Sequence, residues 1–230
     1  MKVIGLIGGM SWESTVPYYR LVNEAVRARL GGLHSARLIL YSVDFHDIER
    51  MQSVGDWDAA GRTLGQAARS LQAAGAEFIV LCTNTMHKVA AAIEDAVDLP
   101  LLHIADPTAQ AILAAGHTRV GLLGTRFTME QGFYRDRLSS RWGLQPVVPS
   151  PIRREHVHRI IYDELCLGVV REDSRAHFRH AVEELVANGA EAVILGCTEI
   201  SLLVSPEDAS VPLFDTTALH ALAAAEYAMR

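Results

Sequence analysis

The stretch Gly189-Ala190-Glu191-Ala192-Val193-Ile194-Leu195-Gly196-Cys197-Thr198-Glu199 decides the fold of this 230-residue chain, because it occurs twice. The earlier copy reads Gly75-Ala76-Glu77-Phe78-Ile79-Val80-Leu81-Cys82-Thr83-Asn84-Thr85. In both copies, a glycine suited to ending a helix leads into a short apolar run that contains β-branched residues. The run stops abruptly at small polar residues and a thiol. This pattern predicts a buried parallel strand that presents reactive side chains at its C-terminal end.

Two further matches show that the repeat covers most of the chain. Val3-Ile4-Gly5-Leu6-Ile7-Gly8 matches Arg119-Val120-Gly121-Leu122-Leu123-Gly124, and Leu99-Pro100-Leu101 matches Val211-Pro212-Leu213. Three matches in the same order and at nearly one spacing indicate a duplicated α/β unit of about 115 residues, a usual size for one small domain. We expect two pseudo-symmetric domains, each a parallel four-stranded sheet flanked by helices.

The duplication also predicts where the domains begin and end. The helix after Pro100 leads into the strand at residue 119, so the helix after Pro212 should lead back to the strand at residue 3. We therefore expect a discontinuous first domain, 1–104 plus 215–230, and a second domain, 105–214.

The predicted elements follow from apolar runs, caps and helix-ending glycines. A helix capped by Ser14 or Thr15, with Pro17 in its first turn, should end near Leu30, and a loop should run from Asp44 through Gln52. The other predicted helices cover about 57–74, 86–97, 107–115, 129–142, 153–167 and 173–188. Strands are predicted at 2–8, 37–43, 77–81, 101–104, 119–123, 145–148 and 191–195.

Composition excludes several classes of protein. The net charge is −6 and no long run of like charges is present, so a nucleic-acid partner is not expected. No apolar stretch reaches the ~18 residues of a membrane span, so no membrane partner is expected. The three cysteines contain no CxxC pair. They fit a reducing compartment, so we expect a cytoplasmic protein.

Common cofactor motifs are missing. The glycines of Gly5-Leu6-Ile7-Gly8-Gly9-Met10 do not fit GxGxxG, and neither a P-loop lysine pattern nor GxSxG occurs. His156-Val157-His158 has no second ligand group at zinc-like spacing, so no metal site is predicted. The remaining histidines are interpreted as surface or helix-end positions.

The three thiols have different expected roles. With Gly75 aligned on Gly189, Cys197 corresponds to Thr83, and Cys82 corresponds to Gly196. Cys82 should point away from Thr83 by strand alternation and pack in the core, and Cys166 lies in an apolar helical run. Cys197 is either a buried structural cysteine or a nucleophile or base. Its place at a strand end favours chemistry, and a helix beginning just after it would lower the thiol pKa.

The residues opposite Cys197 in the repeat also have two interpretations. Thr83 is either a turn-capping hydroxyl or a reactive group. Asn84 and Thr85 either grip a substrate carboxylate or cap the helix that starts near Met86.

Three motifs together resemble the aspartate/glutamate racemase family: Gly8-Gly9-Met10-Ser11, Thr83-Asn84-Thr85-Met86-His87 and Gly196-Cys197-Thr198-Glu199. The resemblance implies an active site between two α/β domains, an amino-acid substrate, a homodimer, and neither pyridoxal phosphate nor a metal. Family members usually carry a cysteine where this chain has Thr83. That departure resembles the branch that acts on L-aspartate and L-glutamate.

The resemblance assigns roles to individual residues. Cys197 and Thr83 would remove and return the α-proton on opposite faces of the substrate, because inversion through a planar carbanion needs a group on each face. Arg50 or Arg126 would meet the side-chain carboxylate. The expected substrate-binding residues are Met10, Gln52, Asn84, Thr85, Thr125, Glu164, Thr198 and Glu199.

Two other classes of function, enzymatic and non-enzymatic, stay open. The same fold with a single thiol suits decarboxylation of a malonate-like acid, and related enzymes isomerise cis–trans dicarboxylic acids. A non-catalytic sensor of amino acids or dicarboxylates would keep the pocket but hold an unreactive Cys197.

Overall fold

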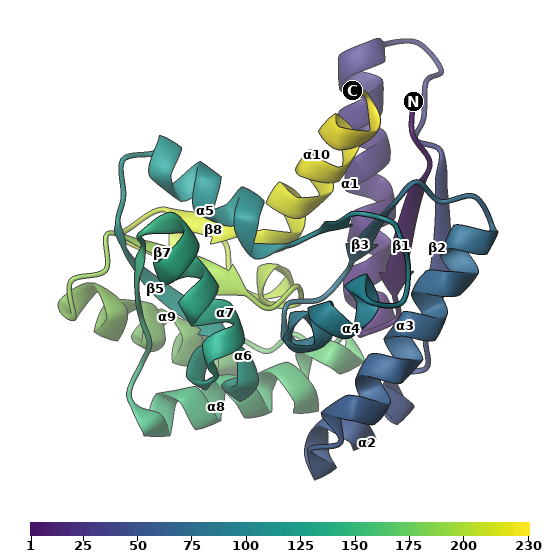
Figure 1. Ribbon diagram of the computed structural model, residues 1–230. Coiled ribbons are helices and arrows are strands. Elements are labelled where there is room, and N and C mark those ends of the chain that lie inside the picture. Colours follow the sequence, from purple (N-terminus) through teal and green to yellow (C-terminus); the bar gives the residue numbers. More distant parts are fainter. The chain divides into compact units, whose positions relative to one another are not determined.

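The computed structural model describes residues 1–230 and divides into two compact units (Figure 1). Unit 1 comprises residues 1–104 and 220–230, and unit 2 comprises residues 105–219. Each unit contains one four-stranded sheet, with strand order β2-β1-β3-β4 in unit 1 and β6-β5-β7-β8 in unit 2. All pairings are parallel, which confirms the predicted fold class.

The sheet of unit 1 lies between two layers of helices. Its strands are β1 (Ile4–Gly8), β2 (Leu38–Ser42), β3 (Phe78–Leu81) and β4 (Leu101–Leu102). Its helical segments are α1 (Trp12–Leu30), α2 (Phe45–Val54), α3 (Trp57–Ala73), η1 (Thr85–Val89), α4 (Ala90–Glu94) and the larger part of α10 (Thr216–Ala228).

Strand alternation sends side chains of unit 1 to two cores. Leu6 and Val80 face α1 and α10, whereas Ile7 and Leu81 face α2, α3 and α4. The part of α10 in unit 1 runs beside α1 (Figure 1). Its fully buried apolar side chains in this core are all alanines, which allows the helix to approach the sheet closely; they are Ala221, Ala224, Ala225 and Ala228.

Unit 2 repeats the plan of unit 1. Its strands are β5 (Arg119–Gly124), β6 (Gln145–Val147), β7 (Ala192–Gly196) and β8 (Leu213–Asp215). Its helical segments are α5 (Ala105–Ala114), α6 (Arg126–Glu130), α7 (Gly132–Asp136), η2 (Arg137–Arg141), α8 (Pro151–Asp163), η3 (Leu165–Leu167), α9 (Glu172–Ala187), η4 (Ile200–Leu202) and η5 (Pro206–Asp208). Leu123, Val193 and Leu195 pack against α8 and α9.

Several predicted boundaries are wrong, each for a local reason. Helix α1 begins at Trp12 with Ser11 as its N-cap residue, so Pro17 lies inside the helix and not in its first turn. The predicted loop from Asp44 to Gln52 is helix α2, because the Asp44 carboxylate accepts the His46 N–H and caps it.

The single helix predicted over 129–142 is also wrong. Gln131 has extended backbone angles (φ −91°, ψ 150°), which divide this segment into α6 and α7, and a π-helical turn follows at η2. The helix predicted to reach Leu167 ends at Asp163 and is followed by η3. None of the helices combines the length and apolarity required to cross a membrane.

Candidate active site

Thr83 and Cys197 occupy the same position in their respective sheets. In unit 1, Leu81 is paired with Ile7 of β1; in unit 2, Leu195 is paired with Leu123 of β5. Thr83 lies two residues beyond Leu81, and Cys197 lies two residues beyond Leu195. Each residue therefore follows the C-terminal end of a central strand, where open parallel sheets bind their ligands.

The strand end of unit 1 is buried and polar. Thr83, Asn84 and Thr85 are all buried, and Asn84 and Thr85 lead into the 3-10 turn η1. The Gln52 amide, on α2, donates a hydrogen bond of 2.9 Å to the Met86 sulfur. Met10, which follows β1, belongs to the same core cluster as Met86. The structure therefore gathers the predicted residues of unit 1 around the ends of β1 and β3.

The glycines after β1 allow this close packing. The Gly9 N–H donates a hydrogen bond of 2.9 Å to the Thr15 hydroxyl of α1. A Cβ atom added to Gly8 would collide with Thr15, and one added to Gly9 would collide with the Val43 backbone. Gly9 also has a φ of 91°, a conformation that favours glycine. Close packing of the backbone therefore explains why positions 8 and 9 are glycine as fully as the approach of a ligand would.

The strand end of unit 2 is organised around one carboxylate. The Cys197 thiol and the Thr198 hydroxyl each donate a hydrogen bond of 2.9 Å to Oε2 of Glu199. All three side chains are buried. Glu199 therefore contacts the candidate catalytic thiol directly, a role that the sequence did not predict for it.

Burial raises the pKa of the Cys197 thiol well above its ordinary value, and the charge of Glu199 raises it further. The expectation of a helix N-terminus that lowers this pKa is wrong. A turn follows Cys197, and the next helical segment is the three-residue 3-10 turn η4. At neutral pH the thiol keeps its proton and shares it with Glu199 through their hydrogen bond.

Of the two remaining cysteines, Cys82 lies in the core of unit 1, whereas Cys166 lies beside Glu199. Cys82 is fully buried in the α1 and α10 core of unit 1, and burial raises its thiol pKa. Cys166 packs against the core of unit 2, where burial and then the Glu199 charge raise its thiol pKa. All three cysteines are free thiols.

Thr125 and Glu164 have structural contacts of their own. Thr125, directly after β5, is the N-cap residue of α6 and lies next to the end of β7 because Gly124 pairs with Gly196. Glu164 ends α8 and accepts a hydrogen bond of 2.6 Å from the Ser174 hydroxyl on α9. It lines a cavity of about 340 Å³ between these helices.

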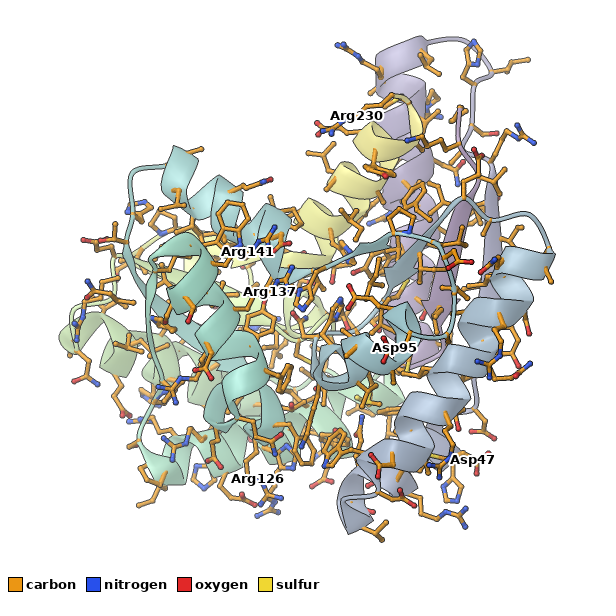
Figure 2. All side chains as sticks on the ribbon, in the orientation of Figure 1. Asp47, Asp95, Arg126, Arg137, Arg141 and Arg230 are labelled. Carbon is orange, nitrogen blue, oxygen red and sulfur yellow. The ribbon has the colours of Figure 1, made fainter.

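The two candidate partners for a substrate carboxylate are both exposed. Arg50 lies on α2. Arg126 lies at the start of α6 (Figure 2). Its guanidinium is 3.9 Å from the Glu155 carboxylate on α8.

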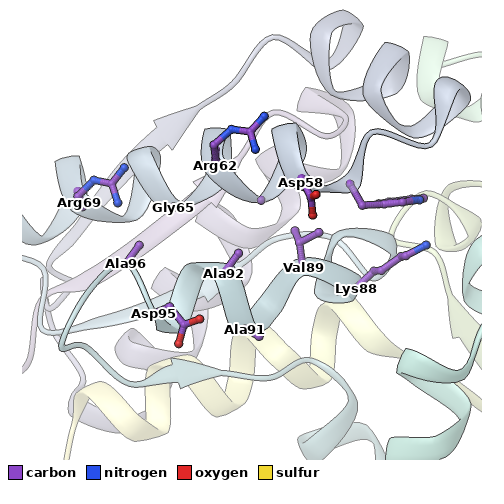
Figure 3. Close-up of a pocket in the computed structure, with 12 residues that line it drawn as sticks. Asp58, Arg62, Gly65, Arg69, Lys88, Val89, Ala91, Ala92, Asp95 and Ala96 are labelled. Atoms are coloured by element: carbon purple, nitrogen blue, oxygen red, sulfur yellow. The ribbon is translucent and has the colours of Figure 1, made fainter.

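A second cavity, of about 570 Å³, lies in unit 1 between α3 and the η1–α4 segment (Figure 3). Arg62 and Arg69 project from α3, and the Lys88 ammonium lies 3.8 Å from the centre of the Trp57 ring. None of the predicted site residues lines this cavity. No group of three or more His, Cys, Asp or Glu side chains is placed to hold a metal ion.

Sequence reasoning missed a set of buried histidines. His87, His103 and His220 are 3%, 7% and 0% exposed, so the interpretation of the histidines as surface or helix-end positions is wrong for these three. The Thr217 hydroxyl, two residues beyond β8, was also missed; it is buried and has no hydrogen-bond partner within the chain. The histidine of Thr83-Asn84-Thr85-Met86-His87 offered a signal, because it lies four residues after Thr83. His220 had none.

Comparison with known proteins gives consistent results. The family model described as Asp/Glu/Hydantoin racemase matches residues 7–224. The broad specificity amino-acid racemase RacX of Bacillus subtilis is 23% identical over 224 residues, which cover 94% of this chain and 93% of RacX.

Two crystal structures cover the whole chain and are themselves covered completely. A candidate Asp/Glu racemase of Yersinia pestis is 61% identical with a TM-score of 0.92. An aspartate racemase homologue of Pyrococcus horikoshii is 36% identical with a TM-score of 0.84.

Proposed function

Because the chain belongs to the Asp/Glu/Hydantoin racemase family, we propose that it racemises aspartate or glutamate without a cofactor. Family membership makes the chain an isomerase of the amino-acid racemase type. The observation that carries the proposal is the equivalent placement of Thr83 and Cys197 at the ends of the central strands of the two sheets. We propose that these two residues act on opposite faces of one substrate.

The reaction begins at Cys197. Transfer of the thiol proton to the Glu199 carboxylate, along their hydrogen bond of 2.9 Å, forms a thiolate. The thiolate then takes the α-proton of the L-enantiomer, so the C–H bond breaks and a new S–H bond forms. Both groups are buried, so no bulk water intervenes between the thiol and its acceptor.

Thr83 completes the inversion. Its hydroxyl gives a proton to the opposite face of the carbanion. The resulting alkoxide recovers a proton from water, and the hydroxide left behind takes the proton held by Glu199, so both groups return to their starting states. Because an alcohol is a much weaker acid than a thiol, this is the difficult half of the reaction. The enzyme should therefore favour L-substrates. It should exchange the α-proton of an L-substrate more often than it converts that substrate to the D-enantiomer.

The carbanion requires electrostatic stabilisation at the substrate α-carboxylate. Preorganised N–H and hydroxyl donors supply it in a metal-free site. We propose Asn84, Thr85 and Thr198 for this role, with Met10, Gln52, Thr125 and Glu164 lining the rest of the site and Arg50 or Arg126 binding the side-chain carboxylate. Glu199 acts on the thiol.

The test is proton NMR of L- and D-aspartate and L- and D-glutamate in D₂O with the purified protein. The L-substrate α-proton signal should disappear, and EDTA or hydroxylamine should leave the rate unchanged. Cys197→Ala should abolish exchange, whereas the matched variant Cys82→Ala, which changes a thiol in the α1 and α10 core, should retain it. Exchange that persists in Cys197→Ala would disprove the proposed base.

A second reaction keeps the same site. A single thiol opposite a hydroxyl also suits decarboxylation of a malonate-like acid, in which only one proton has to be delivered. Proton NMR distinguishes the two reactions. Decarboxylation consumes the malonate-like acid, whereas racemisation leaves the amount of aspartate or glutamate unchanged and alters only its deuterium content and its configuration.

We also propose that the chain forms a homodimer in the cytoplasm. Trp12, Val16 and Tyr19 of α1 are 62%, 59% and 58% exposed and form an apolar stripe, which would be covered in a dimer. The three free thiols fit a reducing compartment. Light scattering coupled to gel filtration should report twice the chain mass, and Val16→Asp should reduce it to the chain mass if α1 forms the interface.

A further inference from the structure

The imidazole of His87 connects the ends of two neighbouring strands of unit 1. Its Nδ1 lies 2.7 Å from the backbone carbonyl oxygen of Thr83, and its Nε2 lies 3.2 Å from the backbone nitrogen of Ile104. Thr83 follows β3, and Ile104 lies two residues beyond β4. The ring therefore joins the segment carrying a candidate catalytic residue to the adjacent strand.

Only one protonation state of His87 satisfies both contacts. A carbonyl oxygen can only accept, so Nδ1 must carry the hydrogen. A backbone N–H can only donate, so Nε2 must present its lone pair. The structure therefore assigns His87 as a neutral imidazole protonated on Nδ1.

The bridge lies where strand pairing ends. Strands β3 and β4 pair at only two positions, Ile79 with Leu101 and Val80 with Leu102. In the 3-10 turn η1, the backbone N–H of His87 bonds to the Asn84 carbonyl at 3.1 Å. The carbonyl oxygen of Thr83 instead accepts a hydrogen bond from the imidazole of His87. At this point a side chain, and not backbone hydrogen bonds, joins the segments that follow β3 and β4.

Neighbouring buried aromatic side chains hold the ring in place. The His103 ring centre lies 4.3 Å from that of His87, and the His220 ring centre lies 6.1 Å away. His220 donates from Nε2 to the Leu102 carbonyl at 2.8 Å, and its Nδ1 lies 2.8 Å from the Tyr18 hydroxyl. His220 thus holds the last residue of β4, and His87 holds Ile104, two residues beyond it.

The corresponding turn in unit 2 is held differently. By the repeat, Ser201 corresponds to His87, and it is exposed with only a long contact of 3.4 Å to the Thr198 carbonyl. The Cys197 turn is instead organised by Glu199. Loss of the His87 bridge should therefore disturb Thr83 and leave Cys197 in place.

We infer that His87 is the positioning residue for Thr83, fixing its hydroxyl for proton return through the hydrogen bond from Nδ1 to the Thr83 carbonyl. The inference rests on the proposed racemase function. It predicts a selective effect: variants that break this bond reduce inversion of the substrate while the Cys197 half-reaction continues.

Two amide substitutions separate the two contacts of the ring. In His87→Asn, the side-chain NH₂ lies near the place of Nδ1 and can still donate to the Thr83 carbonyl. In His87→Gln, the side-chain amide lies near the place of Nε2, so its oxygen can accept from Ile104 N–H while the Thr83 bond is lost. The two variants are matched in polarity and both lack the ring.

The measurement is the number of D-product molecules formed per α-proton exchanged, followed from L-substrate in D₂O. This ratio does not depend on how much of the enzyme is folded. His87→Gln should lower it by about tenfold or more, since a displacement of about 1 Å can cost up to 100-fold in rate. The L-substrate exchange rate and KM should change by less than about threefold, and His87→Asn should lie close to the unmodified protein.

An unchanged ratio in His87→Gln, or equal losses in both variants, would overturn the inference while leaving the racemase function intact. An unmodified protein that exchanges neither enantiomer would instead overturn the proposed function, and this inference with it. If His87→Gln does not fold, the imidazole nitrogen shifts of the unmodified protein decide the question. They should report hydrogen on Nδ1, and hydrogen on Nε2 would overturn the inference.

Discussion

Replacing Glu199 by glutamine should lower the pKa of the Cys197 thiol and slow proton removal from the L-substrate. The thiol donates a hydrogen bond of 2.9 Å to a buried carboxylate, and the carboxylate charge raises the thiol pKa. A glutamine of the same shape removes the charge and the proton acceptor but preserves the packing. The Cys197 thiol should lose its proton at a lower pH, yet the enzyme should remove the α-proton of the L-substrate more slowly.

The size of the effect follows from the separation of the two groups. Two unit charges about 4 Å apart interact by about 4 kcal/mol at an effective dielectric constant of about 20. The Glu199 charge favours the protonated thiol, so its removal should lower the thiol pKa. Burial is the larger cause of the raised pKa and is unchanged by the substitution, so the thiol pKa should remain above its ordinary value.

The assay is the pH dependence of Cys197 alkylation by iodoacetamide, quantified on the peptide by mass spectrometry. The midpoint of the alkylation curve should move to lower pH in Glu199→Gln, and α-proton exchange should fall by about 100-fold or more, the usual contribution of a positioned acid or base. Glu191→Gln is the matched control. That carboxylate lies just before the other end of β7 and accepts hydrogen bonds from the backbone of Thr118 and Arg119.

An alkylation curve that is identical in Glu199→Gln and the unmodified protein would refute this reasoning. It would show that the carboxylate does not control the ionisation of Cys197. A shift of the same size in Glu191→Gln would show that the effect comes from the net charge of the chain and not from the contact.

Three further predictions concern other parts of the molecule. Thr83→Cys should increase turnover of the D-enantiomer, because a thiol is a stronger acid than a hydroxyl; equal D-turnover in both proteins, measured by NMR in D₂O, would contradict it. Gly196→Ala should lower the free energy of unfolding by about 1–3 kcal/mol and reduce activity, because the added Cβ would lie 2.7 Å from the Leu123 carbonyl oxygen. Urea unfolding measures the change in the free energy of unfolding. Burial raises the pKa of Asp208, but the hydrogen bonds that it accepts from the Ser205 backbone N–H, Arg179 and Arg175 outweigh burial and lower this pKa to about 2. Asp208→Asn should therefore cost at most about 2 kcal/mol at pH 7, because Arg179 is partly exposed and screened, and this difference should disappear as the pH falls from about 4 to about 2.

The duplication made much of the fold predictable. Two copies of a strand and its terminal residues fixed the parallel sheets and placed Thr83 opposite Cys197 in the repeat, because a repeated pattern identifies itself without reference to any other protein. Helix α2 was missed since its exposed residues resemble a loop, and the cap at Asp44 was the one local signal for it.

The electrostatics of the site was less predictable. The sequence placed Glu199 beside Cys197 but did not reveal that its carboxylate accepts a hydrogen bond from the thiol, because a side chain three residues beyond a strand can point in several directions. The contact between His220 and the Leu102 carbonyl joins positions far apart in the chain, and no local pattern predicts such a pair.

The way in which α10 completes unit 1 has a consequence for how the protein is made. The strands that α10 covers are synthesised early, whereas Ala221, Ala224, Ala225 and Ala228 leave the ribosome after all of unit 2. Until then, Leu6 and Val80 lack part of their apolar cover. Unit 2 can therefore fold on the ribosome while unit 1 waits, and the nascent chain carries an open apolar surface that chaperones can recognise for most of its synthesis.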